Sequence, residues 1–249
     1  MRIEILGVPI DAVTRTEARL KAEKLLQEPG GHLITTPNPE MLVLADKLPP
    51  FKSALQQAAL AIPDGVGLLY VARKMGTRIP ERVAGSDFML DVAEIASNKR
   101  ASVYLLGGEK AEVWNEAAAE LRRRLPDIRI VGAESGGMIG RNGDGTWEMD
   151  SDLLDRIRVA GPDILFVAFG HGKQEMWIVD HLKDLPSVRL AMGIGGTFDF
   201  LAGRVKRAPV FLRKAGLEWL WRLVIEPWRI GRIWTAVVVF PRLALRSKN

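Results

Sequence analysis

The sequence contains no cysteine, and this absence excludes disulfide bonds and thiolate metal sites. It agrees with a reducing compartment without proving one. Histidine is also scarce: the three residues His32, His171 and His181 are scattered and lack the spacing of metal ligands. We therefore expect no histidine-based metal site.

Long hydrophobic runs are also missing. The longest apolar stretch of the C-terminal region covers residues 233–241, is interrupted by Thr235, and is about half of the ~20 residues that a spanning helix needs. Near the start, Glu4 and Pro9 break up the apolar residues, so we expect no signal peptide. The sequence therefore predicts a protein that lies on a membrane at most and does not cross one.

The charge of the chain is unevenly distributed. Residues 201–249 contain 11 Lys and Arg but only two acids, Glu218 and Glu226, whereas residues 1–200 contain 24 basic and 28 acidic residues. An acidic body of charge −4 therefore carries a tail of charge +9. Four of the seven tryptophans also fall in this tail: Trp219, Trp221, Trp228 and Trp234. We accordingly divide the chain into a body, residues 1–200, and a basic helical appendage, residues 201–249.

Three interpretations of the tail remain open. Basic residues interleaved with Trp and aliphatic residues are typical of an anionic membrane surface, which is the interpretation we favour. A nucleic-acid site fits less well, because the tail is very apolar and has few Ser, Thr, Asn or Gln for backbone contacts, so we expect no nucleic-acid partner. The third interpretation is a helix packed on the body with solvated arginines.

Short aliphatic runs alternate with amphipathic segments through the body. Near-continuous apolar strands favour a parallel sheet that is covered by helices on both faces, an α/β Rossmann-like fold. A Thr14-x-x-Glu17 capping box opens the first helix. The expected strands are residues 2–6, 32–36, 60–62, 102–106, 128–131, 164–169 and 188–194, and the expected helices include 14–26, 66–74, 111–125 and 151–160.

Two further segments allow alternatives. The Gly-rich residues 134–150 are expected to form a lid or a disordered connector. Asp150 and Asp152 form a D-x-D pair that can hold a divalent ion, but their position before an apolar helix favours a helix cap. In the tail, Pro227 is expected to begin a second helix.

Polar clusters follow several expected strands, where open α/β sheets build their sites. Thr36 ends one strand, and Asn38 is placed to cap a helix that begins at Pro39. Asp64 follows another strand between Pro63 and Gly65. It is either a general base in a cleft or the N-cap of the helix 66–74, and the residues alone favour the cap.

A glycine-rich turn precedes Lys173 and Gln174 at the start of a helix, an arrangement that suits an anion such as a diphosphate. Glycine pairs also follow other expected strands and could form similar turns. A dinucleotide-binding fold would need G-x-G-x-x-G after the first strand, but Gly7 stands alone there, so an oxidoreductase of this class is disfavoured.

The ordered set of motifs resembles the WecG/TagA/CpsF glycosyltransferases of bacterial surface polysaccharide synthesis over about residues 1–232. In the body the matching motifs are Thr36-x-Asn38-x-Glu40, Pro63-Asp64-Gly65-x-Gly67, Arg82-x-x-Gly85-x-Asp87, Gly170-x-x-Lys173-Gln174-Glu175 and Gly195-Gly196-x-Phe198-Asp199. In the tail they are Arg207-Ala208-Pro209, Gly216-Leu217-Glu218-Trp219 and Glu226-Pro227-x-Arg229-x-x-Arg232. Members often carry proline where this chain has Gly172.

The resemblance implies an inverting transfer of N-acetylmannosamine from a UDP donor to undecaprenyl-diphosphate-linked N-acetylglucosamine, as in teichoic acid synthesis. It also implies that no metal or other cofactor is needed and that the enzyme sits peripherally at the cytoplasmic membrane face. Relatives that move N-acetylmannosamine uronic acid or glucose for capsule, exopolysaccharide or enterobacterial-type antigen remain alternatives. A non-catalytic membrane adaptor is the alternative of another class, and a homo-oligomer is left open.

By motif position the resemblance assigns a role to each site residue. Asp64 corresponds to the base, and Arg222 joins it as a catalytic residue. The substrate-binding residues are Thr36, Asn38, Arg82, Gln174, Arg229 and Arg232, with Asp199 as the weaker candidate for the nucleotide end. Arg222, Arg229 and Arg232 are spaced seven and three apart, so an unbroken helix would place them on one face, although Pro227 interrupts it.

Overall fold

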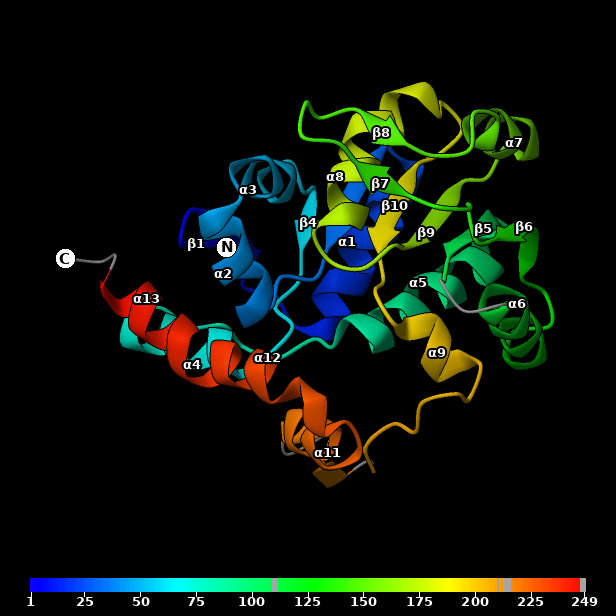
Figure 1. Cartoon of the computed structure of the whole chain (residues 1–249). Coiled ribbons are helices and arrows are strands. Elements are labelled where there is room, and N and C mark those ends of the chain that lie inside the picture. The colour runs from blue at the N-terminus through cyan, green and yellow to red at the C-terminus, as the bar shows by residue number, and fades with distance from the viewer. Residues whose placement is uncertain (109–111, 210, 213–215, 247–249) are drawn as a thin grey trace.

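The computed structural model describes residues 1–108, 112–209, 211–212 and 216–246. Its centre is a six-stranded parallel sheet with the order β4-β3-β10-β9-β5-β6 (Figure 1). The strands are β3 (His32–Thr35), β4 (Leu60–Ala61), β5 (Ser102–Gly107), β6 (Arg129–Glu134), β9 (Ile164–Ala168) and β10 (Leu190–Gly193). This arrangement confirms the predicted α/β class.

Helices cover both faces of the sheet, as the buried strands predict. Alternate side chains of β9 show this: Phe166 packs with the helices of one face and Val167 with those of the other. The first face is covered by α1 (Arg15–Gln27), α5 (Gly85–Lys99), α6 (Val113–Arg124) and α9 (Thr197–Leu201); the second by α7 (Leu153–Ala160), α8 (Lys173–His181) and the short 3-10 helix η1 (Leu182–Asp184). The capping box of Thr14 and Glu17 opens α1 as predicted. Ala111, in the expected helix 111–125, lies outside the described residues.

A third cluster of apolar side chains lies beside the sheet rather than on it. It joins α2 (Pro39–Lys47), α3 (Pro49–Gln56) and α4 (Val66–Lys74) to a hairpin of β1 (Arg2–Ile5) and β2 (Val8–Asp11). The predicted first strand therefore does not enter the parallel sheet. The cause is the turn between β1 and β2. Leu6 and Gly7 both have positive φ there, and the turn folds the two strands into an antiparallel pair.

The Gly-rich segment 134–150 is a second antiparallel hairpin, so the expectation of a disordered connector is wrong. Its strands are β7 (Gly140–Arg141) and β8 (Trp147–Glu148). The Asp144 carboxylate accepts from the amide and hydroxyl of Thr146, which closes the turn between the strands. Trp147 packs against two of the apolar clusters and donates to Asp180 at 2.9 Å, which fastens the hairpin to α8.

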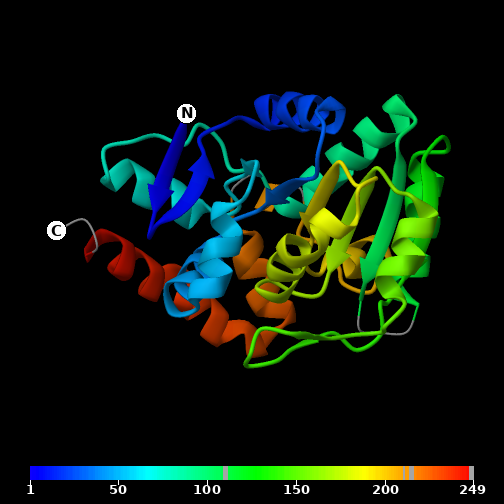
Figure 2. The same ribbon diagram turned by 90° about the horizontal axis from the view of Figure 1, so that it is seen from above.

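The tail returns along the flank of the body (Figures 1 and 2). It consists of α11 (Glu218–Ile225), η2 (Pro227–Arg229), α12 (Ile230–Trp234), the π-helical η3 (Thr235–Val239) and α13 (Phe240–Arg246). Pro227 begins the second part, as predicted. Phe240 is fully buried in the cluster formed with α2 and α4, so the end of the tail belongs to the body's core. None of the described helices has the length and hydropathy of a membrane-spanning segment.

Candidate active site

A cavity of about 870 Å³ lies at the carboxyl ends of the sheet strands, between the body and the tail. Its walls come from the segments after β3, β4, β9 and β10, from the start of α5, and from the tail. Eight of the nine predicted site residues line it: Thr36, Asn38, Asp64, Arg82, Gln174, Arg222, Arg229 and Arg232. Asp199, the weaker candidate, lies on α9 and is not among the lining residues.

The segment after β3 is shaped by a helix cap. The Asn38 Oδ1 atom accepts from the Met41 amide at 3.0 Å, and Pro39 begins α2, as the sequence predicts. Asn38 also lines the cavity, so capping holds it there. Thr36 sits against Gly85, where an added Cβ would approach its side chain to 3.0 Å.

Asp64 is not the N-cap of α4, and this prediction from the residues alone is wrong. Gly65 occupies the cap position, with φ 127°, and no side chain caps this helix. The Asp64 carboxylate turns instead toward α5 and accepts from the Gly85 amide at 3.0 Å. Its other oxygen lies 3.6 Å from Nε of Arg82.

The pKa of Asp64 is raised above its usual value, chiefly because the surrounding protein desolvates the carboxylate. The positive charge of Arg82 and the Gly85 amide oppose this rise, and the negative charge of Glu218 adds to it. The side chain keeps 28% of its surface exposed, but that surface faces the cavity. A carboxylate that is both accessible and more basic than usual is suited to accept a proton.

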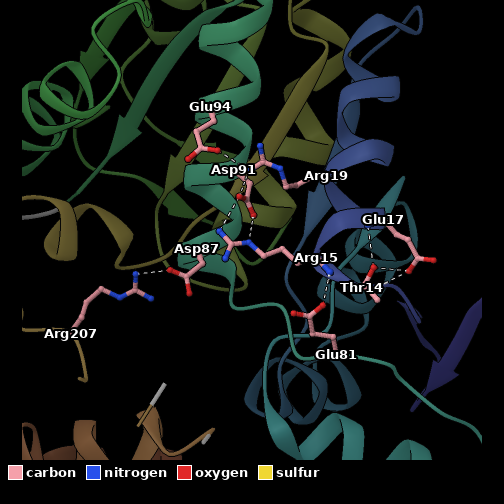
Figure 3. Close-up of polar contacts among 9 residues, drawn as sticks. All are labelled: Thr14, Arg15, Glu17, Arg19, Glu81, Asp87, Asp91, Glu94 and Arg207. Atoms are coloured by element: carbon pink, nitrogen blue, oxygen red, sulfur yellow. Dashed lines mark hydrogen bonds and ion pairs between the residues drawn. The ribbon is translucent and has the colours of Figure 1, made fainter. Parts of the chain in front are cut away.

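Helix α5 holds Asp64 and is itself anchored along its length (Figure 3). Its buried Asp91 accepts from Arg15 at 2.6 and 2.9 Å and also pairs with Arg19, both from α1. Nearer the cavity, Asp87 pairs with Arg207 at 2.7 Å. These contacts fix the N-terminus of α5, which presents the Gly85 amide to the carboxylate.

Gln174 joins two glycine-rich turns. Its Oε1 accepts from the Gly195 amide at 3.0 Å, and its Nε2 donates to the buried Glu175 at 2.7 Å. Gly193 is required here, because a Cβ would approach Gln174 to 2.5 Å. Lys173, expected beside Gln174 at an anion site, instead donates to the Ile139 carbonyl of the hairpin at 3.3 Å.

The tail delivers three arginines to the cavity although Pro227 breaks the helix between them. Arg222 and Arg229 both pair with Glu226, at 2.7 and 3.0 Å, and Arg232 pairs with Glu40 of α2 at 2.5 Å. Burial, together with the charges of its two arginine neighbours, lowers the pKa of Arg229. Such a cluster, short of counter-charge, is suited to bind an anion.

Other cavity residues were not predicted as site residues from the sequence. Glu218, the first residue of α11, accepts from Arg82 at 2.9 Å. Phe200 lies beneath Arg222, whose Cζ is 5.1 Å from the ring centroid. His171 has a lowered pKa, caused first by burial and then by Arg232. Of these residues, Glu218 had a signal in the sequence, because it is one of only two acids in a basic tail.

The described residues contain no group of three or more His, Asp or Glu side chains arranged to hold a metal ion. Asp150 and Asp152 both pair with Arg156, at 3.1 and 2.7 Å. Asp152 occupies the N-cap position of α7 but its side chain makes no cap hydrogen bond. The side-chain cap interpretation is therefore wrong, and both carboxylates share Arg156 as an ion-pair partner.

Comparison with known proteins agrees with this geometry. The sequence model described as "Glycosyl transferase WecG/TagA/CpsF family" matches residues 3–249. An N-acetylglucosaminyldiphosphoundecaprenol N-acetyl-beta-D-mannosaminyltransferase of Bacillus subtilis (strain 168) is 31% identical over 86% of this chain and 78% of its own. The protein of the same name from Staphylococcus aureus (strain MRSA252) is 30% identical over 100% of this chain and 94% of its own. Because this family model covers nearly the whole chain, the chain belongs to the WecG/TagA/CpsF family of glycosyltransferases.

Proposed function

We propose that this glycosyltransferase moves N-acetylmannosamine from UDP-N-acetylmannosamine to the N-acetylglucosamine of an undecaprenyl-diphosphate acceptor, with inversion at the anomeric carbon. The names of the relatives support N-acetylmannosamine as the transferred sugar and N-acetylglucosaminyl-diphosphoundecaprenol as the acceptor, and they favour neither the uronic acid nor the glucose alternative. The observation that carries the proposal is one cavity with a raised-pKa carboxylate, Asp64, facing a wall of tail arginines.

Asp64 is the general base of this reaction. A single displacement needs one carboxylate to remove the proton of the acceptor hydroxyl while the leaving group departs from the opposite side. The Gly85 amide holds one oxygen of Asp64, and the Arg82 guanidinium faces the other at 3.6 Å, so the carboxylate is oriented before the substrate arrives. Thr36 and Asn38 border it and bind the sugars.

The tail arginines neutralise the leaving UDP. Arg222, Arg229 and Arg232 line one region of the cavity, and guanidinium groups bind phosphate oxygens through paired hydrogen bonds. Their carboxylate partners Glu226 and Glu40 occupy the sites that a diphosphate would take. Protein cations of this kind replace the metal that other sugar transferases use, so the reaction proceeds without a metal.

The same tail docks the enzyme peripherally on the cytoplasmic face of the membrane. Five large apolar side chains of its described residues are exposed at 60 to 74% of their surface: Phe211, Val224, Trp228, Ile230 and Trp234. Exposed Trp and aliphatic residues beside arginines suit the headgroup region of an anionic bilayer. Docking there presents the cavity to a lipid-linked acceptor.

The test is incubation of the purified chain with a panel of UDP-sugars and a lipid-diphosphate N-acetylglucosamine acceptor. Transfer is expected from UDP-N-acetylmannosamine, and efficient transfer only from a uronic acid or glucose donor would replace the donor assignment. Calorimetric titration with UDP separates an enzyme from a non-catalytic membrane adaptor, since an adaptor has no need to bind it.

A further inference from the structure

The acidic residue Glu218 is anomalous in its surroundings. It belongs to the basic tail, yet its side chain is only 14% exposed and lies in the wall of the cavity. The other acid of the tail, Glu226, pairs with tail arginines, whereas Glu218 reaches the body and accepts from Nη2 of Arg82 at 2.9 Å. A carboxylate therefore enters the active site when the tail is seated.

Arg82 is thereby shared between two carboxylates. Its Nη2 atom is committed to Glu218, and its Nε atom lies 3.6 Å from Asp64, longer than a hydrogen bond. A second guanidinium, that of Arg207, lies 3.8 Å from Glu218 and pairs with Asp87 of α5. The order Asp64, Arg82, Glu218, Arg207, Asp87 forms a chain of alternating charge from the base to α5.

This chain has a consequence for Asp64. An arginine without a competitor beside a buried carboxylate would hold it strongly as the anion and make it a weak base. Glu218 draws the guanidinium away and adds a nearby negative charge, and both effects make Asp64 more basic. Consistent with this, the negative charge of Glu218 raises the pKa of Asp64 while Arg82 lowers it.

We propose that Glu218 is a positioning residue that acts through Arg82, so that Asp64 becomes an effective base only when the tail is seated on the body. The inference rests on the proposed function, in which Asp64 is the base. The tail then does more than supply cations, because Glu218 of α11 also sets the basicity of Asp64 through Arg82.

Other charged and titratable groups surround the same cavity and are part of the background of any titration. Glu40 of α2, His171 before α8, and Arg222, Arg229 and Arg232 of the tail line the cavity. Asp87 of α5, Arg207 after α9 and Glu226 of the tail do not line it but form ion pairs near it. The largest influences on the pKa of Asp64, besides its desolvation, are Arg82, the Gly85 amide and Glu218. A substitution at Glu226 therefore serves as a matched control, because it removes a tail carboxylate that contacts neither Asp64 nor Arg82 in the described contacts.

The experiment measures the titration of Asp64 directly and the rate separately. The full chain, labelled with ¹³C in its aspartate carboxylates, is titrated by NMR in detergent micelles, and Asp64→Asn identifies the resonance of Asp64. Wild type, Glu218→Gln and Glu226→Gln are compared, and the pH profile of kcat/KM is recorded for the same three proteins. Glu218→Asp, which keeps the charge, serves as a second variant if the amide form folds poorly.

We expect Glu218→Gln to lower the midpoint of Asp64 by about one pH unit, and the acid limb of kcat/KM to move by the same amount. Glu226→Gln should leave the midpoint of Asp64 unchanged, and Glu218→Asp should keep it closer to the wild-type value. An unchanged midpoint in Glu218→Gln, or equal shifts in the two glutamine variants, would overturn the inference. If the midpoint of Asp64 moves but the acid limb of kcat/KM does not, Glu218 still tunes Asp64, but Asp64 is not the base of the reaction.

Discussion

At the scale of single residues, the function depends on carboxylates whose surroundings alter their basicity. Asp64 and Glu175 both have raised pKa values because the protein desolvates them, but only Asp64 lines the cavity. Glu175 is fully buried, accepts from Gln174 and from the Gly172 amide, and has a pKa of about 7. Asp64 is therefore placed to take part in the chemistry, whereas Glu175 holds the turn and the glutamine beside the cavity in place.

Replacing Asp64 by Asn should lower kcat by about 10²–10⁴, the usual contribution of a positioned general base. The amide is isosteric and still accepts from Gly85, so circular dichroism and the unfolding midpoint should stay near wild type. A folded variant with near wild-type turnover would mean that another group removes the proton.

Glu175 should make stability depend on pH. Its pKa is about 7 when folded and near 4.5 when unfolded, so above pH 4.5 only the folded protein retains the proton. Its contribution to stability is complete below pH 4.5 and disappears as the pH rises to about 7, a change on the order of 3 kcal/mol. Urea unfolding of wild type and Glu175→Gln from pH 4.5 to 7.5 measures it: the difference between the two should vary with pH, and a constant difference would contradict the assignment.

At the scale of elements, α5 carries the geometry of the base. Asp91 is 1% exposed and holds two arginines of α1, so Asp91→Asn removes a buried charge from its partners. We expect a loss of about 1–3 kcal/mol, less than for a fully buried pair because Arg15 and Arg19 reach solvent. Urea unfolding measures this loss, and Lys24→Gln, which breaks only the exposed Lys24–Glu28 pair, is the control with little effect. Equal stabilities of the two variants would show that Asp91 does not anchor α5.

The tail helices should separate into two roles. Trp228→Ala combined with Trp234→Ala removes apolar surface that is 74 and 60% exposed, so vesicle binding should weaken while turnover on a water-soluble acceptor analogue is largely kept. Arg222→Ala should lower turnover on that analogue with little effect on sedimentation with vesicles. Full activity of Arg222→Ala on the analogue would leave the tail as an anchor only.

Comparison of the predicted and observed elements shows which features the sequence alone could predict. The buried strands predicted the sheet, the capping box of Thr14 and Glu17 predicted the start of α1, and Asn38 with Pro39 predicted the start of α2, because these signals are local. Asp64 was misread as a helix cap because its true partner, the Gly85 amide, lies 21 residues away and is brought near only by the fold. The strand at residues 2–6 was predicted, but its antiparallel pairing with β2 was not, because the turn at Leu6 and Gly7 carries no Asn-Gly signal. Asp199 was carried over by motif position, and its place in the nucleotide site stays a prediction.

At the scale of the whole molecule, the body and tail form one site. The predicted division at residue 200 falls within α9, and Phe240 from the far end of the tail is buried with α2 and α4. Of the carboxylates that line the cavity, Glu40 and Asp64 come from the acidic body and Glu218 from the basic tail, whereas three of its four arginines come from the tail. The excess of positive charge in the tail is thus directed in part into the cavity.

Activity of the whole enzyme should survive chelation. Arginines from the tail are expected to stabilise the leaving diphosphate, so EDTA should leave turnover unchanged within about a factor of two. The assay is repeated after dialysis against EDTA, with and without added Mg²⁺ or Mn²⁺. Loss of activity that either ion restores would require a metal site that this account lacks.

The anomeric configuration of the product tests the central claim most directly. The full chain is incubated with UDP-N-acetylmannosamine and a lipid-diphosphate N-acetylglucosamine acceptor, and the new linkage is read by the one-bond carbon–proton coupling in NMR. A single displacement assisted by Asp64 predicts one disaccharide with the configuration inverted relative to the donor. A retained configuration, or no transfer of N-acetylmannosamine to this acceptor, would contradict the account.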